Sequence, residues 1–111
     1  MKFLIVCSSS GGHVYPGWNF GNYLRKCGEK IKFLGIKGEI EEKIIKKEDL
    51  ITLDAPKSFK KSLKHLKTTI ASLKQINRIV DDYDVIIGFG GFITFLVSMC
   101  PNVKKKEVLF A

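Results

Sequence analysis

The sequence of 111 residues predicts an open, doubly wound α/β domain, in which helices cover both faces of a parallel sheet. The first observation is an alternation of five apolar, strand-like runs with four helix-like segments, which is typical of parallel sheets. The second is that two glycine-rich segments, SSSGGH (8–13) and GFGGF (88–92), coincide with the ends of two of these runs. Because ligands bind outside the carboxyl ends of the strands in such sheets, both segments are candidates for the functional site.

The expected strands are short runs in which apolar residues follow one another without alternation, as in strands that are buried on both faces. The runs KFLIVC and YDVIIGFG are the clearest examples. The five expected strands lie at 2–7, 30–35, 50–54, 83–90 and 106–111.

The four helix-like segments carry different signals. In the first, Pro16 suits the first turn and Gly28 suits the C-terminal end. The second has acidic residues in its first turn and lysines in its last, which matches the helix dipole. The third repeats apolar residues every three or four positions from Phe59 to Val80, including Ile70, and this stripe is expected to pack on the sheet. The segments cover 16–28, 39–48, 58–80 and 92–100, the last being the apolar run FITFLVSMC.

Composition indicates a folded globular chain, because 45% of the residues are apolar and 27% are charged. Its length suits a single domain over residues 1–111. The opening run MKFLIVC is too short for a signal peptide, and the run at 92–100 is half of the length that spans a bilayer. We therefore expect a cytoplasmic protein. Its cysteines are expected to be free thiols in a reducing compartment, and they are Cys7, Cys27 and Cys100.

The two glycine-rich segments can hold phosphate or pyrophosphate. A loop with few side chains lets backbone N–H groups approach an anion, and the N-terminus of the following helix adds partial positive charge. The first segment lacks the G-x-G-x-x-G fingerprint of dinucleotide-binding domains, which argues against a dinucleotide-dependent oxidoreductase. It also lacks the G-x-x-x-x-G-K-[ST] phosphate loop of nucleoside triphosphatases. The alternative is that the glycines only form tight turns. The residues concerned are Ser10, Gly11, Gly12, Gly88, Gly90 and Gly91.

His13 is the titratable residue of the first segment. A neutral imidazole at this place can take a proton from a substrate hydroxyl. A histidine that caps or packs against the following helix is the alternative, and the spacing alone leaves both open.

The stretch SSSGGHVYPG, followed about 75 residues later by DVIIGFGGF, resembles the N-terminal half of the MurG-type N-acetylglucosaminyltransferases. These are two-domain GT-B enzymes of glycosyltransferase family 28. The family pattern G-G-T-G-G-H-x-x-P-[AG] corresponds to residues 8–17, and the pattern G-x-G-G-[YF] corresponds to 88–92. The segment FLGIKGEIEEKII is also similar to the family, so the resemblance covers essentially the whole chain.

This resemblance implies a Rossmann-like domain whose glycine loops bind the diphosphate of a lipid-linked sugar acceptor. It implies that His13 is the base beside the reacting hydroxyl, and that N-acetylglucosamine comes from UDP-GlcNAc in peptidoglycan precursor synthesis, with no cofactor and no metal. Phe92 stands where the family often has tyrosine, and Ser8 and Ser9 replace the first two glycines of the pattern. The family's His-Glu-x-Asn segment and donor-binding domain would follow about Ala111, so this chain alone is expected to be inactive.

The positive charge is concentrated in one segment, because residues 55–80 contain seven basic residues and no acidic one. A basic residue near an anionic leaflet contributes about 1 kcal/mol to membrane binding, so this segment is suited to attach the protein to a membrane surface. The resemblance favours membrane attachment, because the family's acceptor lies in the inner leaflet. It implies a peripheral location on the inner face of the cell membrane. A solvated helix face is the alternative, and nucleic-acid binding lacks the stacking aromatics that it needs. The expected membrane-facing residues are Phe59, Lys60, Lys61, Leu63, Lys64 and Lys67.

Three functions therefore stay open. The first is the acceptor-binding half of a MurG-type glycosyltransferase. The second is a membrane-recruiting subunit of a split enzyme, in which another chain supplies the donor domain. The third is a non-catalytic module that binds phosphate or a membrane surface.

Overall fold

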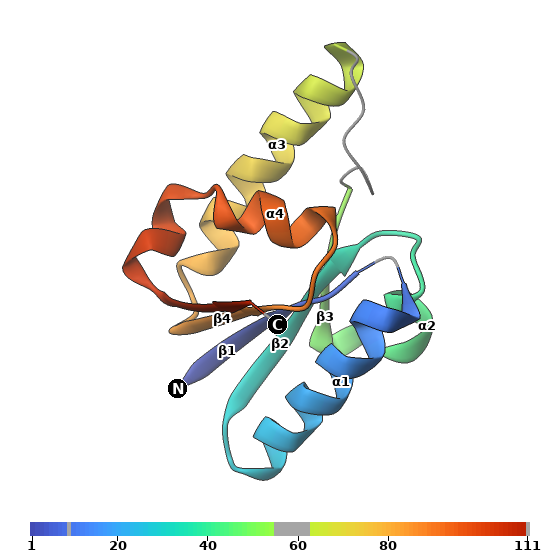
Figure 1. The fold of residues 1–111 in the computed structure, drawn as a ribbon, viewed down its shortest axis with the longest axis vertical. Coiled ribbons are helices and arrows are strands. Elements are labelled where there is room, and N and C mark those ends of the chain that lie inside the picture. The colour runs from blue at the N-terminus through green and yellow to red at the C-terminus, as the bar shows by residue number, and fades with distance from the viewer. Residues whose placement is uncertain (9, 55–62, 111) are drawn as a thin grey trace.

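A five-stranded parallel sheet forms the centre of the molecule, as the sequence predicts (Figure 1). The computed structural model describes residues 1–8, 10–54 and 63–110, with the backbone alone for 63–66 and 105. The strands follow the spatial order β3-β2-β1-β4-β5. They are β1 (Lys2–Val6), β2 (Lys30–Ile36), β3 (Leu50–Leu53), β4 (Val85–Gly88) and β5 (Glu107–Phe110).

The order of the strands reverses at β1, which lies between β2 and β4. Val6 at the end of β1 is level with Leu34 on one side and with Gly88 on the other. The carboxyl ends of β1 and β4 therefore lie side by side, and this is the switch point at which open α/β sheets bind ligands.

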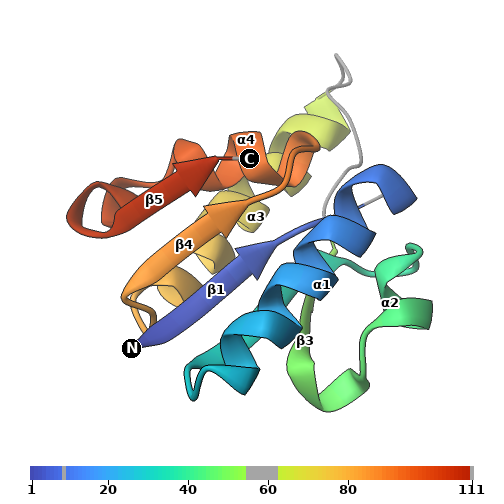
Figure 2. The same ribbon diagram turned by 60° about the horizontal axis from the view of Figure 1, so that its bottom comes forward.

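Helices cover both faces of the sheet, which explains why the strands are apolar without alternation (Figure 2). Two of them, α1 (Gly11–Lys26) and α2 (Glu41–Ile44), cover one face, and α3 (Leu63–Val80) and α4 (Phe92–Ser98) cover the other. Along β1, Leu4 belongs to the core under α3 and α4, while Ile5 belongs to the core under α1.

The first helix begins five residues earlier than the sequence suggested. It starts at Gly11, where the N–H of Val14 donates to the carbonyl of Ser10 at 2.9 Å. Pro16 consequently lies inside the helix rather than in its first turn. It cannot donate to the carbonyl of Gly12, but both residues are exposed, so water can satisfy that carbonyl.

The second helix is much shorter than the expected segment at 39–48. It ends at Ile44, and a 3-10 turn, η1 (Lys47–Asp49), follows it. Ile45 has extended backbone (φ −99°, ψ 136°) and is buried in the same core as Phe33. Burial of this one side chain therefore ends a helix that the local charge pattern would have continued.

Among the described side chains of the long helix α3, from Lys67 onwards, those that are fully buried lie in its C-terminal half. Ile76 and Val80 are fully buried, but 46% of Ile70 is exposed, so the expectation that Ile70 packs on the sheet is wrong. The physical reason is length, because 18 helical residues span about 27 Å whereas a four-residue strand spans about 13 Å. The N-terminal half of α3 therefore projects past the sheet (Figure 1).

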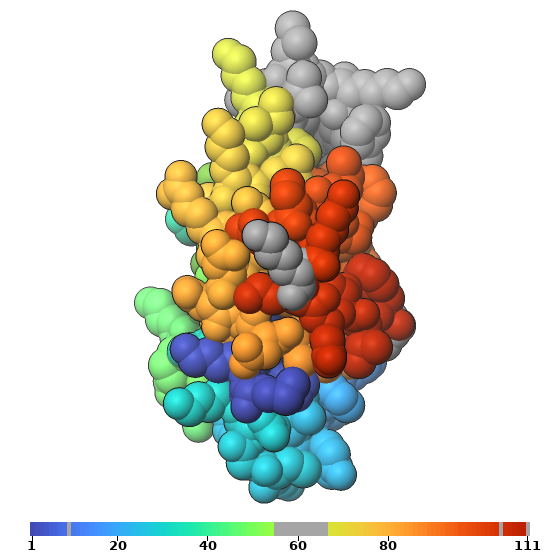
Figure 3. Space-filling model, turned by 90° about the vertical axis from the view of Figure 1, so that its left-hand side faces the viewer, coloured from blue at the N-terminus to red at the C-terminus, as the bar shows by residue number. Residues whose placement is uncertain are grey.

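A second 3-10 turn, η2 (Pro101–Lys105), connects α4 to β5 and packs beside α3 (Figure 3). The backbone N–H of Asn102 donates to the side-chain oxygen of Asn77 at 2.9 Å, and the Asn102 amide donates to the Asn77 carbonyl at 2.8 Å. This pair of hydrogen bonds fixes the connection on the α3 side of the sheet.

Candidate functional site

The two glycine-rich segments meet at the switch point of the sheet. After β1 the chain passes through Cys7 and Ser8 into α1, and after β4 it passes through Phe89 and Gly90 into α4. The N–H of Phe89 donates to the carbonyl of Val6 at 2.9 Å, and this hydrogen bond joins the segment after β4 to the end of β1. Segments that are about 75 residues apart in the sequence therefore form one site.

His13 joins the two segments directly. It is the third residue of α1, and its imidazole lies against the loop that precedes α4. A Cβ atom on Gly90 would lie 2.9 Å from Nε2 of His13, and a Cβ atom on Gly91 would lie 3.6 Å from Nδ1. The imidazole therefore occupies the space that a side chain at position 90 would need, and it would be in ordinary contact with one at position 91.

One nitrogen of this imidazole, Nδ1, makes no hydrogen bond within the described residues. Nδ1 of His13 is buried, and within the described part of the chain it has no hydrogen-bond partner. An unpartnered buried polar atom costs about 1–3 kcal/mol. A bound group that offered a hydrogen bond, or a small rotation of the ring toward such a group, would recover part of this cost.

The backbone conformation explains why the second segment is rich in glycine. Gly90 and Gly91 have φ values of +88° and +86°, in the left-handed region that side chains disfavour. Gly88 differs, because it is buried at the end of β4, and a Cβ atom there would lie 2.5 Å from Cγ2 of Thr94. Close packing therefore accounts for Gly88, and a ligand contact at this residue stays a prediction.

The N-terminus of α1 lies at the site, because the helix begins within the first glycine-rich segment. Within the described residues, its first turn contains no acidic side chain, and Ser10 at the N-cap makes no side-chain capping bond. Ser10 and Gly12 are exposed, and Gly11 is partly exposed. Unpaired N–H groups and the dipole of a 16-residue helix together favour an anion here.

Phe92 follows the second glycine-rich loop and has packing contacts of its own. It opens α4, and its side chain packs against the core on the α3 side of the sheet. Its ring also stacks on Phe95, with the ring centroids 5.9 Å apart. An acceptor contact by Phe92 stays a prediction, and packing already explains an aromatic residue at this position.

The sequence analysis missed Glu41, which it treated only as an acid at the start of a helix. Glu41 is fully buried, and its carboxylate accepts hydrogen bonds from the Ile36 N–H at 2.7 Å and from the Ser8 hydroxyl. A signal was present, because Glu41 lies three and four positions before Ile44 and Ile45 and thus shares their face in a helix.

Cys7 lies directly before Ser8 at this end of the sheet. Burial, with a smaller contribution from the charge of Glu41, raises the pKa of the Cys7 thiol to about 12. The thiol is therefore protonated at neutral pH and packs as an apolar residue. Cys27 and Cys100 are free thiols too, which confirms the prediction from the cysteine pattern.

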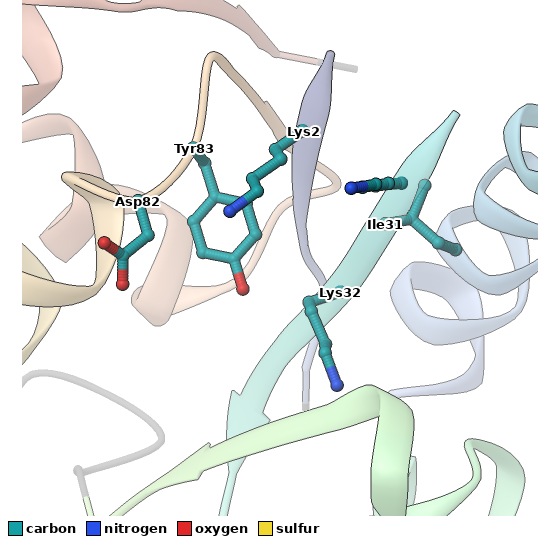
Figure 4. A pocket seen from close by; sticks show the side chains of 6 residues that line it. Lys2, Ile31, Lys32, Asp82 and Tyr83 are labelled. Atoms are coloured by element: carbon teal, nitrogen blue, oxygen red, sulfur yellow. The ribbon is translucent and has the colours of Figure 1, made fainter. Parts of the chain in front are cut away.

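A hollow of about 410 Å³ lies elsewhere, at the amino ends of the strands (Figure 4). Lys2 at the start of β1 and Tyr83 just before β4 are among the residues that line it, with Lys30, Ile31, Lys32 and Asp82. Parallel strands bind ligands at their carboxyl ends. We therefore do not assign this hollow to the candidate site.

The predicted membrane face is only partly described. Phe59, Lys60 and Lys61 lie outside the described residues, and Leu63 and Lys64 open α3. Lys67 is exposed, as expected. Three large apolar side chains of α3, of α4 and of the residue after α4 are about half exposed: Ile70 (46%), Phe95 (54%) and Met99 (56%).

No helix in the described part of the chain is long and apolar enough to cross a membrane.

Comparisons with known proteins identify a family and a similar fold. Residues 3–100 match the glycosyltransferase family 28 N-terminal domain. The chain is 32% identical to a protein of Buchnera aphidicola over 84% of this chain and 28% of that protein. It is 29% identical to a protein of Caldanaerobacter subterraneus over 98% of this chain and 33% of that protein. Both relatives are named UDP-N-acetylglucosamine–N-acetylmuramyl-(pentapeptide) pyrophosphoryl-undecaprenol N-acetylglucosamine transferase.

The crystal structure of Acinetobacter baumannii MurG has a similar fold, with a TM-score of 0.69 and 18% sequence identity. The match covers 98% of this chain and 33% of that one. The chain thus spans about a third of the length of the relatives that it matches.

Proposed function

We propose that this chain, which belongs to glycosyltransferase family 28 through its N-terminal domain, is the acceptor-binding half of an N-acetylglucosaminyltransferase. The acceptor would be a sugar carried on a lipid diphosphate, and the donor would be UDP-N-acetylglucosamine. The observation that carries the proposal is the contact of His13 with Gly90 and Gly91, which combines two glycine-rich segments and one imidazole in a single site. The names of the relatives supply the chemistry of the two substrates.

The acceptor diphosphate would lie against the N-terminus of α1. Backbone N–H groups of Gly11 and Gly12 and the helix dipole would balance its negative charge. The loop at Gly90 and Gly91 would close the other side of the diphosphate, because it lacks side chains that would keep the anion away.

His13 would act as the general base. Its imidazole would accept the proton of the acceptor hydroxyl while the hydroxyl oxygen forms a bond to the anomeric carbon of the donor sugar. The bond from that carbon to the UDP oxygen would break, and UDP would leave with the electron pair. A donor-binding domain is needed to hold the UDP-sugar in line, and such a domain would lie outside residues 1–111.

The exposed side chains of Lys67, Ile70, Phe95 and Met99 would together make up the surface that faces the membrane. A cationic residue beside half-exposed apolar side chains fits an anionic lipid surface, because the apolar groups enter the interface and the charge contacts headgroups. The acceptor lipid would then reach the glycine loops from this side. This surface would place the protein peripherally on the inner face of the cell membrane.

A binding experiment tests the proposed function with the chain itself. Calorimetric titration would use a short-chain, soluble analogue of the diphosphate-linked N-acetylmuramoyl pentapeptide, inorganic pyrophosphate and UDP-N-acetylglucosamine. We expect the acceptor analogue to bind, pyrophosphate to compete with it, and UDP-N-acetylglucosamine not to bind.

The other possible results separate the alternatives. If pyrophosphate bound as tightly as the acceptor analogue, the chain would be a phosphate-binding module without sugar recognition. If only the UDP-sugar bound, the assignment to the acceptor half would be wrong. A split enzyme would give the expected binding results, and addition of a separate donor-domain chain would then restore transfer.

A further inference from the structure

We propose that Glu41 is a positioning residue, which sets the conformation of the first glycine loop through Ser8. This inference deepens the proposed function, because the loop in question is the one assigned to the acceptor diphosphate. Glu41 itself lies below the loop and would not touch the substrate.

The burial of Glu41 requires a specific reason. The side chain is fully buried at the start of α2, and a buried carboxylate is costly unless hydrogen bonds or charges compensate for it. Donors to its Oε2 atom within the described part of the chain include the backbone N–H of Ile36 at 2.7 Å and the hydroxyl of Ser8. The first donor belongs to the end of β2, and the second belongs to the exit from β1.

The surrounding packing is fitted to this carboxylate. A Cβ atom on Gly35 would lie 2.6 Å from Cγ and 2.7 Å from Oε2 of Glu41, so only glycine leaves room for the side chain to pass over β2. The acid is thus inserted between α2 and the sheet, and its position is fixed from both sides.

Ser8 links the Glu41 carboxylate to the proposed site. It is almost fully buried, and it precedes Ser10, the N-cap of α1, by two residues. Its carbonyl oxygen would lie 3.5 Å from a Cβ atom on Gly91, so the same residue also contacts the second glycine loop. A hydroxyl held by Glu41 therefore fixes the backbone on which the N-terminus of α1 and the His13 imidazole depend.

A helix packed on the sheet would not by itself need an acid here. An apolar side chain of similar volume would fill the space under α2 without the desolvation cost of a carboxylate. Such a side chain would, however, leave the Ser8 hydroxyl and the Ile36 N–H without this acceptor. The structure therefore favours a role in orienting the loop over a role in packing alone.

The test compares Glu41→Met, Ser8→Ala and the double variant, with Glu42→Met as the matched control. Methionine is similar in size to glutamate and has no oxygen that could accept the two hydrogen bonds, whereas glutamine would keep one. Glu42 is the next residue of α2, and it is exposed. Ser8→Ala breaks the same hydrogen bond from the other side with a smaller change in the core, and so it keeps the test valid if Glu41→Met does not fold. Two quantities are measured well below the unfolding temperature. One is amide hydrogen exchange at His13 and Val14, whose N–H groups donate to the Ser10 carbonyl at 3.1 Å and 2.9 Å, and the other is the Kd for inorganic pyrophosphate.

We expect faster exchange at these amides and about tenfold weaker pyrophosphate binding in each single variant, as is typical when a group that orients a ligand-binding residue is lost. The double variant should bind pyrophosphate no more weakly than Glu41→Met alone, because both changes remove the Ser8–Glu41 hydrogen bond. Glu42→Met should match the wild type. A purely structural role would lower the unfolding temperature of Glu41→Met without changing the Kd or the exchange at these amides, and this result would overturn the proposal.

The two proposals fail in different ways. If the wild type did not bind pyrophosphate, the diphosphate assignment under the proposed function would be wrong, while the exchange rates would still decide whether Glu41 holds the loop. If the wild type bound pyrophosphate and the variants did so equally well, the proposed function would stand and the role of Glu41 would be refuted.

Discussion

The contact between Gly90 and His13 can be tested by the substitution Gly90→Ala. The new Cβ atom would lie 2.9 Å from Nε2, 3.0 Å from Cδ2 and 3.3 Å from Cε1 of His13. Ordinary contacts begin at 3.4 Å, so the imidazole and the loop must separate by about half an ångström. The site would then lose the arrangement that we assign to catalysis.

Two terms contribute to the cost of this substitution. Gly90 has φ +88°, and an alanine held in such a conformation costs about 1–3 kcal/mol of folding free energy. Overpacking against the imidazole adds about 1–3 kcal/mol. Gly28→Ala provides a matched control for the first term, because Gly28 has φ +90° and a Cβ atom there would meet nothing within 4 Å.

Thermal unfolding followed by circular dichroism measures the difference between the two variants. Because 1 kcal/mol shifts the unfolding temperature of a domain of this size by about 4–8 °C, the overpacking term of about 1–3 kcal/mol should make Gly90→Ala unfold about 4–24 °C below Gly28→Ala. The added substitution His13→Ala should recover most of this difference, since it removes the ring that the new methyl group meets. Pyrophosphate binding should be weakened in Gly90→Ala and unchanged in Gly28→Ala.

Equal unfolding temperatures for the two variants, together with unchanged pyrophosphate binding, would refute this reasoning. That result would mean that the imidazole moves away at no cost and that its contact with the loop does not shape the site.

Three further predictions concern the core, the thiols and the membrane face. Gly21→Ala should lower the free energy of unfolding by about 1–3 kcal/mol in urea, because the new Cβ atom would lie 2.4 Å from Cζ of Phe33; the gain of about 1 kcal/mol expected from helix propensity alone would contradict this. Iodoacetamide at pH 8 should modify the exposed Cys27 and leave Cys7 intact, because burial raises the pKa of Cys7 to about 12; modification of Cys7 in the folded protein would disprove this. The contribution of Cys7 to the free energy of unfolding should be fully present below about pH 9 and should be lost as the pH rises towards 12. Replacement of four lysines by glutamate should abolish co-sedimentation with anionic liposomes, whereas replacement of Lys26 alone should preserve it; the four lysines are Lys60, Lys61, Lys64 and Lys67. Equal binding by both variants would contradict the proposed membrane face.

The local pattern of the sequence was sufficient to predict the fold. Continuous apolar runs mark strands that are buried on both faces, and their alternation with helices implies a parallel sheet with right-handed connections. Those rules predicted the five strands, and the structure confirms them. The pairing of the two glycine-rich segments was predictable for the same reason, because the carboxyl ends of parallel strands share one edge.

The exact ends of the helices depended on packing that the sequence does not state. Gly11 and Gly12 have low helix propensity, yet they form the first turn of α1 because the helix packs on the sheet as a unit. Ile45 leaves the second helix because the core accepts its side chain only in extended backbone. Ile70 is exposed because α3 is longer than the strand that supports it.

Hydrophobic periodicity and chain connectivity are properties of the amino-acid sequence, and they are enough to predict the elements, their order and the edge of the sheet where the site lies. The contact of His13 with Gly90 and the burial of Glu41 beneath Ser8 became visible in the folded molecule alone. Both contacts join residues that are far apart in the chain. Their chemistry depends on distances of a few ångströms, which are set by how the helices pack on the sheet.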